Sequence, residues 1–158
     1  MTTEDTTTAQ AHTGSGTPPE LMQTADWFTA PDYTLQRITN LVDRAGHDLM
    51  TVKLLVPGAT ITGTVAPADS FYDWVVEQQT KGTAEFDDGV SEETEQVLDF
   101  LFGQPAAELR AFREADEPSP PELVRYIHLR DAQVRIGQSL TDVGFIRVLL
   151  SQVSSWTI

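Results

Sequence analysis

"MTVKLLVPGATITGTV", residues 50–65, is the stretch that decides the fold, because it predicts a β-hairpin with a specified register. Apolar and polar residues alternate on both sides of Pro57 and Gly58, as they do in strands with one buried face. A shift of one residue would move the whole apolar set to the other face. The connection is either a two-residue Pro-Gly turn or a four-residue loop closed by Leu55 and Thr60. On the apolar face, the expected pairs are Val56–Ala59, Leu54–Ile61 and Met50–Val65.

A second alternating stretch, "RYIHLRDAQVRIG" at residues 125–137, predicts another hairpin with its turn at Asp131 and Ala132. The expected pairs on its buried face are Leu129–Val134 and Ile127–Ile136. The opposite face would then point to solvent. Together with an arginine of the following strand, that face is a candidate interaction face made of Tyr126, His128, Arg130, Arg135 and Arg147. An ordinary solvated face is the alternative, because most exposed polar residues bind nothing specific.

Helical patterns flank the first hairpin. Asp32 is suited to cap a helix in which apolar residues recur at helical spacing up to Gly46. After the hairpin, Asp69 is suited to cap another helix, and a Gly-Gln-Pro sequence beginning at Gly103 predicts a break between two further helices. The helices that follow the hairpin together form a predicted insertion over residues 67–115.

The strand pattern returns near the C-terminus. "VGFIRVLLSQVSSWTI" predicts a nearly continuous apolar strand, a short break at Ser151 and Gln152, and a terminal strand. With strands over residues 49–65 and 123–158, the chain is predicted to have an α+β fold. Its sheet would be a small, largely antiparallel β-barrel or a strongly bent sheet of five to six strands, with one N-terminal helix and the helical insertion.

The domain organisation is predicted from composition. Residues 1–20 are acidic, rich in threonine and almost free of apolar side chains, so we expect a disordered tail. Residues 21–158 are then a single globular domain, long enough to bury a core without metal or disulfide staples. "DEPSPP" at residues 116–121 is a stiff, proline-rich linker between the insertion and the last strands.

The chain is strongly acidic. It has 24 acidic residues against 10 basic ones, for a net charge of −14. Scarce lysine and many threonines make this composition typical of a salt-loving organism, in which concentrated salt screens the self-repulsion. A specific cationic partner is the alternative explanation. The same acidity disfavours nucleic-acid binding through a general basic surface. Without a membrane-spanning apolar run or a secretory signal, we expect a cytoplasmic protein and no membrane partner.

No catalytic or ligand-binding motif is recognisable. The chain has no cysteine, which excludes disulfides, zinc–thiolate sites and thiol catalysis. It contains no GxGxxG, P-loop, GxSxG or HExxH motif, and its three histidines lack metal-ligand spacing. "FDDGVSEETE" concentrates carboxylates without the alternating order of a calcium loop, so it is best explained as a solvated acidic loop. We therefore expect no enzyme, no metal and no cofactor.

Three blocks of the sequence occur together in a recognisable order. The first is the hairpin "VKLLVPGATITGTV", with a return strand of the (V/I)TGT type, followed by the aromatic helix start "SFYDW". The second, "YIHLRDAQVRIG", matches a "FIHLKDA…G" segment, and the third, "IRVLLSQVSSWTI", aligns with "WRGxLxxVDGFxL". In this order and spacing they resemble the gas-vesicle accessory protein U family, over residues 49–77 and 125–158.

The resemblance has matches and departures at named positions. The C-terminal block aligns without a gap at Arg147, Leu150, Val153, Trp156 and Ile158. In that block Ile146 replaces the family tryptophan, Val148 a glycine, and Ser154-Ser155 an Asp-Gly pair, so a contact made by those positions would be altered here. The family-motif positions expected to be structural are Gly58, Gly63, Phe71, Asp131, Gly137 and Trp156.

The resemblance implies a non-enzymatic cytoplasmic protein that helps gas vesicles to assemble, remain stable or cluster. Its partners would be the vesicle shell, other accessory proteins or further copies of itself. The strands also resemble the small Sm-like or SH3-like barrel, and an Sm-like oligomer that binds RNA is the alternative function. A regulatory small-molecule module is a third possibility, although the sequence carries no pocket signature for it. Fold alone does not decide among these classes.

Overall fold

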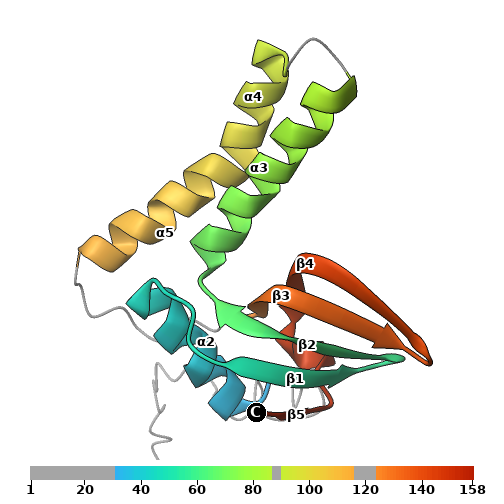
Figure 1. Cartoon of the computed structure of the whole chain (residues 1–158). Coiled ribbons are helices and arrows are strands. Elements are labelled where there is room, and N and C mark those ends of the chain that lie inside the picture. Colours follow the sequence, from blue (N-terminus) through green and yellow to red (C-terminus); the bar gives the residue numbers. More distant parts are fainter. Residues whose placement is uncertain (1–30, 87–89, 116–123) are drawn as a thin grey trace, which may run out of the picture. The chain divides into compact units, whose positions relative to one another are not determined.

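The computed structural model describes residues 31–86, 90–115 and 124–158, with the backbone only for residues 83–86. The predicted tail, the linker 116–121 and residues 21–30 of the predicted domain lie outside these ranges. The elements, in chain order, are α2 (Tyr33–Ala45), β1 (Thr51–Val56), β2 (Ala59–Ala66), α3 (Ala68–Phe86), α4 (Glu92–Leu98), the π-helical turn η1 (Asp99–Gly103), α5 (Gln104–Glu114), β3 (Tyr126–Ile136), β4 (Ser139–Leu149), the 3₁₀ turn η2 (Leu150–Gln152) and β5 (Ser155–Thr157) (Figure 1).

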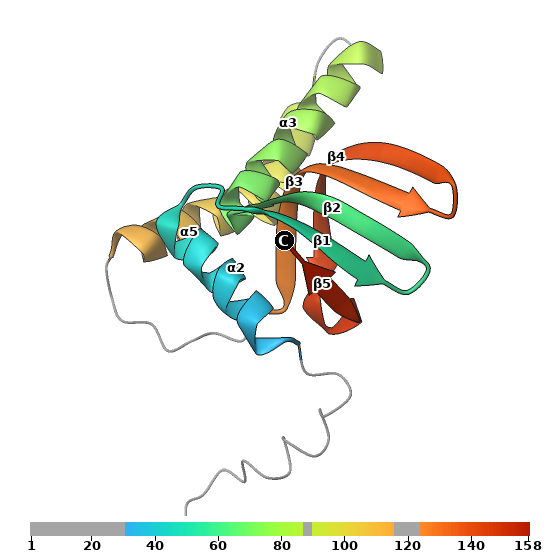
Figure 2. The same cartoon turned by 60° about the horizontal axis from the view of Figure 1, so that its bottom comes forward.

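The five strands form one antiparallel sheet in the order β4-β3-β2-β1-β5. The sheet is open, because β4 and β5 lie at its two edges and do not pair with each other. The predicted α+β class is therefore confirmed, in its form of a bent sheet and not of a closed barrel. Figure 2 shows the twist of the sheet, which turns the β3–β4 hairpin away from β1 and β2.

The first hairpin is confirmed in its register. Val56 pairs with Ala59 and Leu54 with Ile61, and the backbone N–H of Val65 donates to the carbonyl of Met50. The connection is the two-residue turn, in which Gly58 has φ +80°, a conformation that glycine adopts without steric cost. Val52, Leu54, Ile61 and Val65 on this face are buried, as the alternation predicts, and Val56 and Ala59 beside the turn are half-buried.

The predicted turn of the second hairpin is wrong. Asp131 and Ala132 do not reverse the chain, because β3 runs through them to Ile136. The reversal comes at the next two residues, Gly137 and Gln138, where Gly137 has φ +58°. Asp131 has φ +50° and lies at a bulge, where the pairing with both neighbouring strands shifts register.

The bulge explains why the predicted pairs fail. An extra residue in one strand changes which side chains point to which face beyond it. Ile136 was expected to be buried opposite Ile127, yet it is 63% exposed near the free end of the hairpin. Longer pairing outweighs the local turn signal, since ten residues of β3 find partners in β4 and Gly137 supplies the left-handed conformation that a tight turn needs.

Helix α2 covers the apolar face of the sheet. As predicted, Asp32 caps it by accepting a hydrogen bond from the N–H of Leu35, and it ends at Gly46 with φ +71°. Its buried side chains are Leu35, Thr39 and Val42. The core cluster that they join consists of Leu35, Val42, Val52, Leu54, Ile61, Val65, Ile127, Leu129, Ala132, Val148 and Leu150. This is the main apolar core of the residues described.

The helical insertion between β2 and β3 is confirmed, with two corrections. Helix α3 begins at Ala68, so Asp69 lies inside its first turn and does not cap it. The Oδ1 atom of Asp43 in α2 accepts the N–H of Ala68 at 2.9 Å. The predicted break at Gly103 is instead the π-helical turn η1, through which the chain continues into α5. The wider turn accommodates Pro105, which has no N–H for an α-helical hydrogen bond.

Candidate functional site

The candidate interaction face lies beneath the start of α3. Arg147 of β4 places its guanidinium 3.7 Å from the centroid of the Tyr126 ring and 5.9 Å from that of the Tyr72 ring in α3. Arg147 is exposed, and a cation–π contact at an exposed site contributes about 0.5–1 kcal/mol. Arg147 and Tyr126 therefore contact each other, and Arg147 also contacts the insertion.

His128 is a correction to the predicted solvent face, because its side chain is only 3% exposed. Its ring lies 5.1 Å from the centroid of Phe71 and 6.2 Å from that of Tyr72, both in α3. Neither ring nitrogen has a hydrogen-bond partner among the described residues. Burial, and then the nearby charge of Arg147, lower the pKa of His128 to about 4. A buried neutral imidazole packed between aromatic rings is a core residue and not a surface contact.

The other two arginines of the face have different environments. Arg130 lies over the Phe145 ring, 5.2 Å from its centroid, and its Nη1 atom forms an ion pair with Asp48 at 3.1 Å. Arg135 is exposed and pairs across the sheet with Thr60 and Leu140, beyond the bulge. Four of the five predicted residues thus surround the start of α3, and Arg135 lies apart from them on the projecting hairpin.

The family-motif positions lie at turns, at a bulge and in close packing contacts of the fold. Gly58 and Gly137 form the two hairpin turns. A Cβ atom on Gly63 would come 2.9 Å from the Cβ of Leu129, so the close approach of β2 to β3 requires glycine there. Phe71 contacts the rings of His128 and Phe145. Asp131 occupies the bulge, and Trp156 of β5 pairs with Leu54 and packs on the core.

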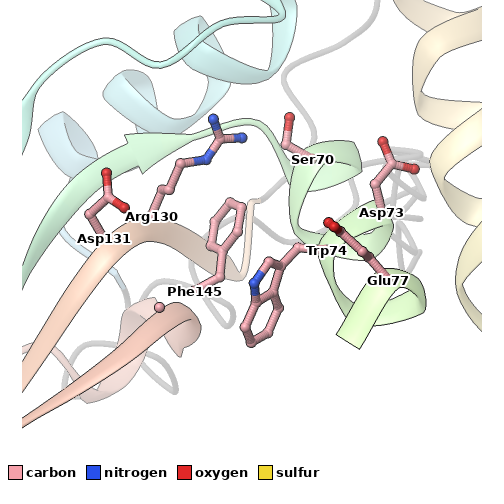
Figure 3. Close-up of a pocket in the computed structure, with 8 residues that line it drawn as sticks. Ser70, Asp73, Trp74, Glu77, Arg130, Asp131 and Phe145 are labelled. Atoms are coloured by element: carbon pink, nitrogen blue, oxygen red, sulfur yellow. The ribbon is translucent and has the colours of Figure 1, made fainter. Parts of the chain in front are cut away.

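A groove of about 390 Å³ opens where α3 passes over β3 and β4. Its lining residues are Ser70, Asp73, Trp74, Glu77, Arg130, Asp131, Gly144 and Phe145. Figure 3 shows the rings of Trp74 and Phe145 between two sets of polar side chains, with the acidic residues of α3 on one side and Arg130 and Asp131 on the other. The two ring centroids are 6.0 Å apart. The residues of α3 that line this groove were missed by sequence reasoning.

A signal for the α3 wall exists in the sequence. Ser70, Asp73, Trp74 and Glu77 are spaced by three, one and three residues, which places them on one face of a helix. The opposite wall could not be located from the sequence, because the bulge at Asp131 decides which side chains of the hairpin approach the helix.

An ion-pair network holds this wall in place. The buried carboxylate of Asp69 accepts hydrogen bonds from Arg113 at 2.7 Å and from Arg110 at 3.2 Å, and Arg110 also pairs with Asp73. Arg113 donates in addition to the backbone carbonyl of Asp43 at 2.7 Å. Burial is the main reason that the pKa of Asp43 is raised to about 6. The network ties α5 to the root of α3 and to α2.

The insertion also exposes a run of apolar side chains, here called the apolar stripe: Val97, Phe100 and Leu101, which are 55%, 67% and 50% exposed. They follow the helical spacing i, i+3, i+4 at the junction of α4 and η1, so they lie close together on one side. Large apolar side chains that remain exposed together commonly mark a contact surface for another protein.

Two searches within the described residues gave negative results. No group of three or more histidine, aspartate or glutamate side chains there could hold a metal ion. None of the helices in the same ranges is both long enough and apolar enough to cross a membrane.

The comparisons with known proteins give one match. The model of a protein family described as "Gas vesicle protein GvpU-like" matches residues 32–158. This range includes both strand regions and the whole helical insertion, of which the sequence motifs covered only the part up to residue 77. No curated protein and no solved structure matches the chain.

Proposed function

The chain belongs to the GvpU-like family of gas vesicle proteins, and we propose that it is a non-enzymatic accessory protein that acts on gas vesicles through protein–protein contacts. In this role it helps the vesicles to assemble, to remain stable or to cluster. Its partners are the vesicle shell, other accessory proteins or further copies of this chain.

The observation that carries this proposal is the apolar stripe on the insertion. Burying a large apolar side chain contributes roughly 1.5–3 kcal/mol, so leaving three of them exposed is unfavourable unless a partner covers them. The stripe also lies in a strongly acidic chain, whose charge otherwise favours a separated, monomeric state in dilute salt. An apolar contact retains its strength in concentrated salt, where charge contacts between surfaces are screened.

Flotation tests the proposal directly, because gas-filled vesicles rise during centrifugation and carry bound protein with them. We expect the purified full chain to appear in the floating layer with isolated gas vesicles, and to stay in solution without them. Replacing Phe100 and Leu101 by serine should deplete the protein from that layer. The matched control replaces two exposed leucines outside the stripe by serine: Leu41, which is 56% exposed, and Leu140, which is 50% exposed.

Light scattering of the same vesicle suspensions measures clustering, and sedimentation of the protein alone measures self-association. A wild-type chain that neither floats with vesicles nor changes their scattering would contradict the proposed function. If the stripe variant behaves like the wild type, the vesicle contact lies elsewhere. Arg130 and Arg147 give the RNA-binding alternative little support, because Arg130 is paired with Asp48 and Arg147, although exposed, lies over the Tyr126 ring.

A further inference from the structure

The groove between α3 and the β3–β4 hairpin is lined by two aromatic rings, of which Trp74 is half-buried and Phe145 is only 5% exposed. Trp74 comes from α3 and Phe145 from β4, so the groove exists only where the insertion meets the sheet. Gly144, with φ +69°, lies beside the Trp74 ring, and a Cβ atom there would be in ordinary van der Waals contact with it at 3.4 Å. Aromatic rings at an open groove offer a flat surface on which a partner side chain stacks.

Most charges that line the groove have a partner. Of its three carboxylates, Asp73 pairs with Arg110 and Glu77 with Lys81, which leaves Asp131 without an ion pair among the described residues. Asp48 forms an ion pair with Arg130 and so balances its charge. The groove therefore presents an aromatic surface together with a carboxylate whose charge is not balanced. An anionic ligand would be repelled.

Two other occupants fit less well. The described carboxylates do not gather into a group that could hold a metal ion, so a bare divalent cation has no set of ligands here. A purely apolar side chain would cover the rings but would displace water from the carboxylates without replacing its hydrogen bonds. A cation attached to an apolar or planar body satisfies both parts of the groove at once.

We propose that this groove receives an arginine side chain of a protein partner. The planar guanidinium stacks on an aromatic face and donates paired hydrogen bonds to a carboxylate, which an ammonium group does less well. In this arrangement the arginine side chain spans the groove, packs against Trp74 on one side and donates from its guanidinium to Asp131 on the other. The proposal rests on the proposed function and deepens it, since it names the chemistry of one contact that the accessory protein makes.

Titration of the ¹⁵N-labelled full chain with the peptide acetyl-Gly-Arg-Gly-amide tests the site by NMR. The same peptide with citrulline in place of arginine is the neutral control, because citrulline keeps the shape of the side chain and lacks its charge. We expect the arginine peptide to shift the indole N–H signal of Trp74 and the amide signal of Gly144 in a saturable way. The citrulline peptide should shift them much less.

Two variants identify the binding groups. Asp131→Asn removes the charge while keeping the bulge, because asparagine tolerates positive φ well, and it should weaken binding of the arginine peptide about fivefold. Trp74→Leu should weaken it by a similar factor, about fivefold. The matched control is Glu108→Gln, which removes one exposed carboxylate outside the groove and should leave the affinity unchanged.

Two results would overturn the proposal: equal binding of the arginine and citrulline peptides, or wild-type affinity in folded Asp131→Asn. Flotation with gas vesicles separates this failure from that of the proposed function. If the wild type and Asp131→Asn float equally well, the function stands and the arginine contact is wrong. If the wild type does not float, yet the peptide binds with the expected dependence on Asp131, the groove stands and the assigned function is wrong.

Discussion

Replacing Asp69 by asparagine should loosen the whole helical insertion. The Asp69 side chain is 8% exposed and accepts hydrogen bonds from two arginines of α5, Arg110 and Arg113. Asparagine keeps the size of the side chain and one acceptor oxygen but removes the charge, so both guanidinium groups lose the carboxylate that they share. Arg113 is the more affected, because its side chain is only 22% exposed whereas that of Arg110 is 41% exposed.

The expected cost follows from these exposures. A hydrogen bond to a charged group contributes about 1.5–3 kcal/mol, and removing one partner of a fully buried ion pair costs about 3–5 kcal/mol. Water reaches both arginines here, and Arg110 keeps a second carboxylate in Asp73. We therefore expect Asp69→Asn to lower the free energy of unfolding by about 2 kcal/mol.

Urea unfolding followed by circular dichroism measures this difference. The matched control is Glu77→Gln, which neutralises the carboxylate of a pair with Lys81 in which both side chains are more than half exposed. That change should alter the free energy of unfolding by less than about 0.5 kcal/mol. If Asp69→Asn costs no more than Glu77→Gln, the network does not anchor the insertion and the reasoning is refuted. A double-mutant cycle with Arg113→Met would measure the coupling of the central pair.

Four further predictions concern pH, packing and salt. The folded pKa of His128, about 4, lies below its unfolded value of 6.5, so stability is lost as pH falls through this range, and His128→Phe should remove that loss in urea titrations. The folded pKa of Asp43, about 6, lies above its unfolded value of 3.8, so stability is lost as pH rises between these values. Asp43→Asn should therefore be more stable than the wild type at pH 7, and an unchanged or lower unfolding midpoint there would contradict this. Gly63→Ala should cost about 1–3 kcal/mol by forcing a Cβ against Leu129, whereas Gly82→Ala in α3, with open space around it, should stabilise by up to about 1 kcal/mol. If the acidity is an adaptation to salt, the thermal midpoint should rise from dilute buffer to molar salt, and equal midpoints would refute that explanation.

Local patterns predicted much of the described fold. The alternation in β1 and β2 gave the register of their pairs, and the cap at Asp32 and the glycine at Gly46 gave the bounds of α2. These features depend on residues close in sequence, whose steric and hydrogen-bonding preferences act before any tertiary contact forms. The prediction of the second turn failed because two turn signals compete in that stretch, Asp131-Ala132 and Gly137-Gln138, and the chain reverses at the second.

The environment of His128 could not be predicted from its own strand. Alternation correctly placed it on the face opposite Ile127 and Leu129, but that face is covered by Phe71 and Tyr72 from an insertion far away in the sequence. Burial therefore depends on where another element packs. For the same reason Arg135 has a different environment from the other predicted residues: it lies on the part of the hairpin that α3 does not cover.

By itself, the sequence determined the helical and strand regions, the register of the first hairpin, the α+β class, the absence of cysteine chemistry and the motifs that indicate the gas vesicle family, because each of these follows from composition or short-range spacing. Only the tertiary structure decided that the sheet stays open, that Asp131 forms a bulge and that α3 and β4 enclose a groove around Trp74 and Phe145. These features arise where residues distant in the chain compete for the same surface, and the outcome depends on packing that no single stretch contains.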